Sequence, residues 1–351
     1  MKKNGGRIDE CGGEMYNDLS LFETKGVLYL AVFEMPVAEL YRYTGANERP
    51  DDFDAYWDRA IAEMEALGTD CTLTPARFSF PNVECFDLTF TGVGGARIHC
   101  RYARPAKRTE PLPAVCMFHG YSTDCGSFSA MLHFVAAGFA VASMSCRGQG
   151  GLSEDPASVQ GNTLHGHIIR GLADPDPDKL YYRNVFLDTA QLARIVMAMP
   201  EVDSSRVCAT GGSQGGGLTL VCAALTPNLF RAAPRCPFLC DYRRVWEMDL
   251  DVNAYAELRE FFRHTDPRHE RETEIFTKLG YIDNQFLAPR IQAEIIMFTG
   301  LMDQICPPSS QFAAYNRITA PKRAILYPDF FHEDYPDQHD ITLAFFAGTA
   351  W

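Results

Sequence analysis

Basic residues are scarce in this chain. Its 351 residues include 32 lysines and arginines against 45 aspartates and glutamates, which gives a formal net charge of −13 at pH 7. A protein that binds the phosphate backbone of a nucleic acid needs a basic stripe, and the basic clusters here are isolated pairs such as Arg243-Arg244. The composition therefore argues against nucleic-acid binding and predicts a soluble, acidic protein.

The sequence also lacks long apolar runs. Its first apolar stretch, VLYLAVF at 27–33, is short and follows acidic residues such as Glu14 and Asp18. A transmembrane helix needs about 20 apolar residues, and a secretory signal joins a basic start to an apolar segment and a cleavage site. We therefore expect neither a membrane span nor a secretory signal.

Cysteine pairs with the spacing of zinc sites are missing as well. The 12 cysteines are spread from Cys11 to Cys306, and many lie within apolar segments. CPFLC, with Cys236 and Cys240, has the wrong spacing and no second pair. The two histidines of HGH at 165–167 could bind a metal, but loop histidines with protein partners are more common. We expect free thiols in a reducing compartment, no metal and no cofactor.

No linker rich in proline, glycine and serine divides the chain. Residues 1–31 are polar and lack periodicity, so we expect a mobile N-terminal extension, followed by one domain over 32–351. The 46% of apolar residues suffice for one large core. The charged stretch 241–285 shows helix patterns but no strand pattern, and we interpret it as an excursion over that domain.

Strand and helix patterns alternate along most of the remaining chain. Strands are predicted over 85–90, 97–103, 114–120, 140–146, 206–210, 293–300 and 323–330. Helices are predicted over 51–67, 127–138, 184–199, from 218 onward, over 310–319 and over 341–348. The first two strands are typical of a hairpin. Short apolar strands separated by helices predict an α/β fold, with a mostly parallel, twisted sheet that helices cover on both faces.

The segment TGGSQGGG at 210–217 connects a predicted strand to a predicted helix. It has no lysine after its glycines and no G-x-G-x-x-G register, so it fits neither phosphate-binding loop. It does contain G-x-S-x-G from Gly211 to Gly215, which is typical of the nucleophile elbow of α/β-hydrolases. Small residues must flank the serine because a Cβ there would clash with the neighbouring strand or helix. We therefore predict an α/β-hydrolase fold with Ser213 as the nucleophile.

In this fold the acid and the histidine of the catalytic triad follow the serine along the chain. Four histidines do so, namely His264, His269, His332 and His339. The first two fall in the charged excursion, and His339 precedes the last predicted helix. His332 lies in a loop after a predicted strand, which is where the base is expected. Asp303 directly follows another predicted strand and is preferred as the acid over Asp283 and Asp329.

An acyl-transfer site also needs two hydrogen-bond donors for the oxyanion. The backbone N–H of Gln214, at the start of a helix, is one candidate. The loop FHGYSTD after the strand 114–120 offers the backbone N–H of Tyr121 as the other. The alternative for Tyr121 is an ordinary surface tyrosine.

Four motifs follow one another along the chain, namely RGQG at 147–150, GGSQGGG at 211–217, GLMDQICPPSSQFAAYN at 300–316 and HE at 332–333. Together they resemble the cephalosporin-C deacetylase/acetyl xylan esterase family, carbohydrate esterase family 7. The likeness covers roughly residues 32–348, and residues 1–31 have no counterpart in it. The resemblance implies a serine esterase that removes acetyl groups from small acetylated sugars, xylo-oligosaccharides and cephalosporin C.

The resemblance also implies roles for individual residues. It assigns Ser213, Asp303 and His332 as the catalytic triad. It assigns the backbone N–H groups of Tyr121 and Gln214 as the oxyanion hole. It assigns supporting roles to three signature residues, Arg147, Gln149 and Glu333, for each of which a polar surface position is the alternative. Family members are cytoplasmic, metal-free and commonly hexameric, with active sites that face an inner cavity.

Two other functions stay open at the level of the sequence. Another α/β-hydrolase, such as a short-chain carboxylesterase, a lipase or a peptidase, would keep the triad and change the acyl pocket, although no long apolar lid is apparent. A non-catalytic binding protein of the same fold usually lacks a triad member, and all three are present here.

Overall fold

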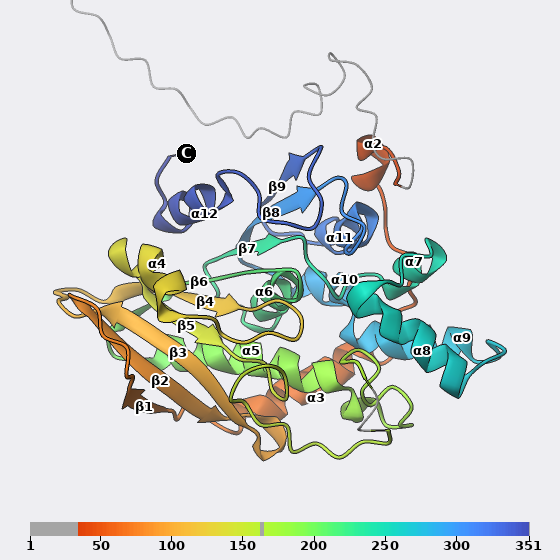
Figure 1. Cartoon of the computed structure of the whole chain (residues 1–351), viewed down its shortest axis with the longest axis horizontal. Helices are drawn as coiled ribbons and strands as arrows, with labels where there is room; N and C mark the ends of the chain where they lie inside the picture. Colours follow the sequence, from red (N-terminus) through yellow and green to blue (C-terminus); the bar gives the residue numbers. More distant parts are fainter. Residues whose placement is uncertain (1–33, 162–164, 351) are drawn as a thin grey trace, which may run out of the picture.

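The computed structural model describes residues 34–161 and 165–350, and the predicted extension over 1–31 lies outside them. This part of the chain contains one nine-stranded sheet in the order β1-β2-β3-β5-β4-β6-β7-β8-β9 (Figure 1). Its strands are β1 (Thr72–Pro75), β2 (Val83–Thr91), β3 (Arg97–Pro105), β4 (Leu112–Phe118), β5 (Ala140–Met144), β6 (Val202–Gly212), β7 (Arg231–Arg235), β8 (Glu294–Gly300) and β9 (Lys322–Tyr327).

The sheet is antiparallel at one end and parallel over the rest. β1, β2, β3 and β5 pair antiparallel in that order, and β2 and β3 form the predicted hairpin, with Thr91 opposite Arg97. From β5 through β4 to β9 every pair is parallel. Parallel strands need crossover connections, and helices supply them here. The prediction of a mostly parallel sheet is confirmed.

Helices cover both faces of the sheet, as predicted (Figure 1). In β8, Ile295 packs in one apolar cluster with α3 (Phe53–Glu65), α5 (Tyr181–Ala198) and α6 (Gln214–Leu225). Ile296 and Phe298 pack in a second cluster with α4 (Leu132–Ala136) and α12 (Gln338–Ala347). This alternation is the period of two of a strand. Among the described helices, none is long and apolar enough to cross a membrane.

Two strands were not predicted from the sequence. β1 is a short, mostly exposed edge strand. β7 has the sequence RAAPR and lies inside the sheet, where Pro234 is opposite Gly211 of β6. Alanine favours strands weakly, and proline is unusual away from sheet edges. The predicted helix over 127–138 is also shorter than expected, because residues 128–131 form a 3₁₀ turn before α4.

The excursion at 241–285 is helical and holds no strand, as predicted. Its helices are α7 (Tyr242–Glu247), α8 (Ala256–Thr265), α9 (Glu272–Leu279) and the start of α10 (Asn284–Leu287). Two fully buried carboxylates hold it to an early segment of the chain. Asp241 accepts hydrogen bonds from the backbone N–H groups of Ala46 and Asn47, and Asp283 accepts from the backbone N–H of Asp241 and the amide of Asn47.

Candidate active site

Ser213 lies at the turn between β6 and α6. Its φ of 59° and ψ of −120° belong to a region that residues with a side chain rarely adopt. Two backbone hydrogen bonds of 3.0 Å hold this conformation, one from the Ser213 N–H to the carbonyl of Arg235 and one from the Phe238 N–H to the carbonyl of Ser213. The serine is therefore fixed on a sharp turn at the carboxyl ends of the parallel strands.

Close backbone contacts explain the glycines on either side of this serine. A Cβ at Gly211 would lie 2.5 Å from the carbonyl oxygen of Phe118, and a Cβ at Gly215 would lie 2.0 Å from the same atom. Real Cβ atoms do not approach other atoms so closely. Strand β4 and helix α6 can meet only if these two positions carry no side chain, which is the steric requirement inferred from G-x-S-x-G.

Asp303 and His332 meet beyond the ends of β8 and β9. Nδ1 of His332 lies 2.8 Å from Oδ2 of Asp303. The other carboxylate oxygen of Asp303 accepts hydrogen bonds of 2.9 Å from the backbone N–H groups of Ile305 and Cys306. Asp303 is fully buried, so these bonds fix its orientation. The structure thus brings together the acid and the base selected from the sequence. Asp283, a weaker candidate for the acid, instead accepts a hydrogen bond from the backbone N–H of Asp241.

The surroundings of His332 favour its cationic form. Burial of the ring lowers the pKa of His332, but hydrogen bonds, that to Asp303 among them, help to raise it overall above its ordinary value. Burial raises the pKa of the neighbouring Cys306 to about 12, so this thiol is neutral near pH 7. The carboxylate of Asp303 is therefore the group that stabilises the imidazolium, as a general base requires when it accepts a proton.

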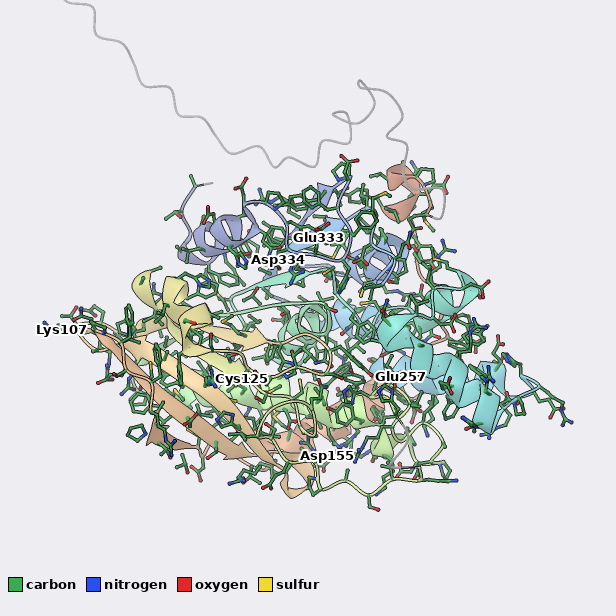
Figure 2. The ribbon with its side chains drawn as sticks, viewed as in Figure 1. Lys107, Cys125, Asp155, Glu257, Glu333 and Asp334 are labelled. Atoms are coloured by element: carbon green, nitrogen blue, oxygen red, sulfur yellow. The ribbon has the colours of Figure 1, made fainter. Side chains whose placement is uncertain are left out.

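Arg235, at the end of β7, holds the loop that carries His332. Its guanidinium donates to the carbonyl of Glu333 at 2.8 Å and forms an ion pair of 2.9 Å with Asp334. The Glu333 carboxylate accepts a 3.0 Å hydrogen bond from the Phe331 N–H. Figure 2 shows Glu333 and Asp334 close together in this loop after β9. The exposed signature residue Glu333 thus supports its own loop.

Ser213 and His332 line one cavity of about 550 Å³, together with Gly120 and residues of α4 and α12. His339 also lines it. The expectation that His339 precedes the last helix is wrong, because α12 begins at Gln338 and places His339 in its first turn. The His339 ring hydrogen bonds to the Gln338 side chain at 3.3 Å and pairs with no carboxylate among the described residues. His332 is therefore the better placed base.

The two proposed oxyanion donors lie next to this turn. Gln214 is the first residue of α6, so its backbone N–H has no acceptor within the helix. Tyr121 lies in the loop after β4, and its backbone N–H donates to no acceptor in the described part of the chain. The Gln214 side chain donates at 3.3 Å to the carbonyl of Gly120, the residue before Tyr121. Neither N–H group is therefore engaged by another part of the chain that the structure describes.

Comparison with known proteins settles the family. The model of the acetyl xylan esterase family (AXE1) matches residues 30–349. The chain belongs to this family. Its α/β-hydrolase fold is confirmed by the solved structure of acetyl xylan esterase 1 from Thermoanaerobacterium sp. JW/SL YS485, which is 52% identical with a TM-score of 0.88 over 90% of this chain and 99% of that one.

Other relatives agree with this assignment. The acetyl xylan esterase from Paenibacillus sp. R4 is 34% identical, with a TM-score of 0.85 over 90% of this chain and all of that one. The acetyl esterase Axe7A of Xylanibacter ruminicola is 25% identical over 289 residues, 80% of this chain, and the match spans only 63% of that relative's length. Membership of the acetyl xylan esterase family supports acetyl esterase activity for this chain.

In this acetyl xylan esterase family member, Gln149 connects the two segments that carry the proposed oxyanion donors. Its Nε2 donates to Oε1 of Gln214 at 2.9 Å, and Nε2 of Gln214 donates back to Oε1 of Gln149 at 3.1 Å. The same Oε1 accepts a 3.0 Å hydrogen bond from the N–H of Ser122, next to Tyr121. This reciprocal amide pair fixes the loop after β4 relative to the start of α6.

Arg147 is buried, so the alternative of a surface position is wrong for it. Its guanidinium forms a bidentate pair with Asp188 of α5, at 2.7 Å and 2.6 Å, and donates to the carbonyl of Val93 at 3.0 Å. The Tyr181 hydroxyl donates to the carbonyl of Arg147 at 2.5 Å. The pair therefore holds the RGQ loop of this family against α5. No local pattern of residues indicated Asp188 as its partner.

The ring of Tyr121 is half-buried, so the alternative of an ordinary surface tyrosine is wrong as well. It packs against His167 and Phe238, with ring centroids 4.6 Å and 5.8 Å away. Its hydroxyl donates to Glu257 of α8 at 2.5 Å. Glu257 was missed in the sequence because the charges of the excursion suggested a solvated face.

One group of side chains in this esterase family member has the composition of a metal site. Ligand atoms of Cys236, Asp303 and His332 lie within 4.8 Å of one another. Cys240, its partner in CPFLC, is buried elsewhere, with its thiol against the carbonyl of Phe238. Nδ1 of His332 and Oδ2 of Asp303 are already bound to each other, so these groups are accounted for without a metal.

Proposed function

We propose that this chain is a serine esterase that removes acetyl groups from small acetylated substrates, such as acetylated xylo-oligosaccharides and cephalosporin C. The observation that carries the proposal is the 2.8 Å hydrogen bond between His332 and Asp303, next to a cavity that the strained Ser213 also lines. Membership of the acetyl xylan esterase family supports the acetyl group as the acyl part.

In this proposal Ser213 is the nucleophile. Its Oγ attacks the carbonyl carbon of the acetyl group while Nε2 of His332 takes the hydroxyl proton, and Asp303 stabilises the imidazolium through Nδ1. The oxyanion accepts hydrogen bonds from the backbone N–H groups of Tyr121 and Gln214. When the ester C–O bond breaks, His332 gives the proton to the sugar oxygen and an acetyl-serine remains. Water, deprotonated by the same histidine, then releases acetate and restores the serine.

Three further residues act without touching the substrate. Gln149 sets the distance between the oxyanion donors, Arg147 holds its loop to α5, and Glu333 supports the loop of His332. We further propose a metal-free hexamer that acts in the cytoplasm on substrates small enough to enter an inner cavity. The resemblance of the four sequence motifs to the family supports this part.

Hydrolysis of p-nitrophenyl acetate, butyrate and octanoate tests the acyl preference. We expect kcat/KM to be highest for the acetate and to fall with each longer chain. A preference for octanoate would contradict the deacetylase and indicate another hydrolase of the same fold. Comparing acetylated xylo-oligosaccharides with cephalosporin C then identifies the alcohol part. Activity should survive EDTA, and a loss that zinc restores would contradict the metal-free site.

Ser213→Ala tests the nucleophile in the same assay. Removing the nucleophile of a serine hydrolase lowers kcat by about a millionfold, so we expect no measurable acetate hydrolysis at an unchanged melting temperature. Acetate turnover at the wild-type rate in this variant would exclude Ser213, and with it the proposed mechanism.

A further inference from the structure

Glu257 is a buried carboxylate that the proposed reaction does not use. It lies in the first turn of α8 and is 5% exposed (Figure 2). No lysine, arginine or histidine pairs with it in the part of the chain that the structure describes. Burial raises the pKa of its carboxyl to about 7, although hydrogen bonds to it oppose this effect. Burying a carboxylate without a cation is costly. The hydrogen-bond partners of Glu257 therefore show which parts of the structure it holds.

These partners come from the loop after β4 and from the segment before α5. The Tyr121 hydroxyl donates to Oε1 of Glu257 at 2.5 Å, and the Ile169 N–H donates to Oε2 at 3.2 Å. The backbone passes so close at Gly166 that a Cβ there would lie 2.0 Å from Oε2, and the φ of this glycine is 124°. Residues 166–169 therefore lie directly against the carboxylate.

The Tyr121 hydroxyl uses both of its hydrogen-bonding functions in this arrangement. It donates to Glu257 and accepts a 3.0 Å hydrogen bond from the His167 N–H. Nε2 of His167 in turn bonds to the hydroxyl of Ser122 at 2.9 Å. The Tyr121 hydroxyl cannot move away without breaking two hydrogen bonds. Anchoring the side chain at its hydroxyl end limits how far the Cα and the backbone N–H of Tyr121 can move.

We propose that Glu257 is a positioning residue for the oxyanion hole. Its carboxylate holds the phenol of Tyr121 and thereby aims the Tyr121 backbone N–H at the substrate oxygen. The inference rests on the proposed function, because it takes this N–H to be an oxyanion donor. It also assigns a role to the excursion, because α8 supplies the carboxylate that holds Tyr121 in the loop after β4.

Glu257→Gln and Tyr121→Phe, alone and combined, test this role in the full chain. Loss of one oxyanion donor lowers kcat by about 100- to 1,000-fold, and a misplaced donor should cost less. We expect each single variant to lower kcat for p-nitrophenyl acetate by about 10- to 100-fold, with KM within about twofold of wild type. The double variant should be no slower than the slower single variant, because both changes break the same link.

Glu260→Gln on the same helix is the matched control, because the Glu260 side chain is 62% exposed and its ion-pair partner is His264, away from Tyr121. It should keep the wild-type kcat. A wild-type kcat in folded Glu257→Gln, losses that multiply in the double variant, or an effect on KM alone would each overturn the inference. If Glu257→Gln does not fold, Tyr121→Phe decides, since an unchanged kcat there overturns it equally. Failure of the proposed function itself appears separately, as acetate turnover in Ser213→Ala.

Discussion

At the scale of single residues, the site depends on which histidine faces a carboxylate. His332 and His339 line the same cavity, but only His332 has a buried aspartate at its Nδ1. A base without such a partner gains no stabilisation when it accepts the serine proton. The position of His332 in the sequence, in a loop after a predicted strand, already favoured it as the base, but the sequence alone could not show its contact with Asp303.

His332→Ala and His339→Ala therefore form a matched pair of variants. We expect His332→Ala to lower kcat for p-nitrophenyl acetate by at least about 1,000-fold, because the base is lost. His339→Ala should change kcat less than about threefold. Steady-state kinetics at pH 7.5 checks both, and the reverse order of effects would show that His339 is the base.

At the scale of elements, the excursion is held in place by acidic groups that are unusual in a protein core. Burial, and then the charge of Asp241, raise the pKa of Asp283 above its ordinary value. A carboxyl group whose pKa is higher in the folded than in the unfolded protein favours folding most at low pH, and this contribution is lost as the pH rises through the folded-state pKa. Asp283 should therefore stabilise the fold less at alkaline than at acidic pH.

Asp283→Asn tests this pH dependence. The difference in unfolding free energy between wild type and variant should be larger at pH 5 than at pH 8, by about 1.4 kcal/mol for each pH unit of this interval that lies below the folded-state pKa of Asp283. Urea unfolding at both pH values measures it. Asp70→Asn, at an exposed position, should leave the difference independent of pH. A difference that grows toward pH 8 would contradict the assignment.

The same scale shows what the sequence could predict. Strands with apolar residues, the hairpin and the turn at Ser213 follow from local patterns, and all were found in advance. β7 was missed because alanines and a proline carry almost no strand signal, and its place depends on its neighbours. Arg147 and Glu257 look like solvated residues in the sequence. Only their distant partners, Asp188 and Tyr121, show why they are buried.

At the scale of the whole molecule, the proposed hexamer is open to direct measurement. Light scattering coupled to gel filtration should give a mass of about 235 kDa, six times the 39.2 kDa of one chain. Association follows mass action, so the measurement should be repeated after tenfold dilution. A mass of one or two chains at all concentrations would contradict the hexamer and leave the single-chain site unaffected.

The glycine run after Ser213 limits how this protein can change over generations. A Cβ at Gly215, Gly216 or Gly217 would lie within 2.3 Å of a backbone oxygen, and each position meets a different one, that of Phe118, Arg235 or Phe238. Backbone atoms cannot adapt as side chains do, so we expect no substitution that adds a side chain at these positions to be tolerated. New substrate preferences must arise in the surrounding loops, and a directed-evolution library should leave these three codons untouched.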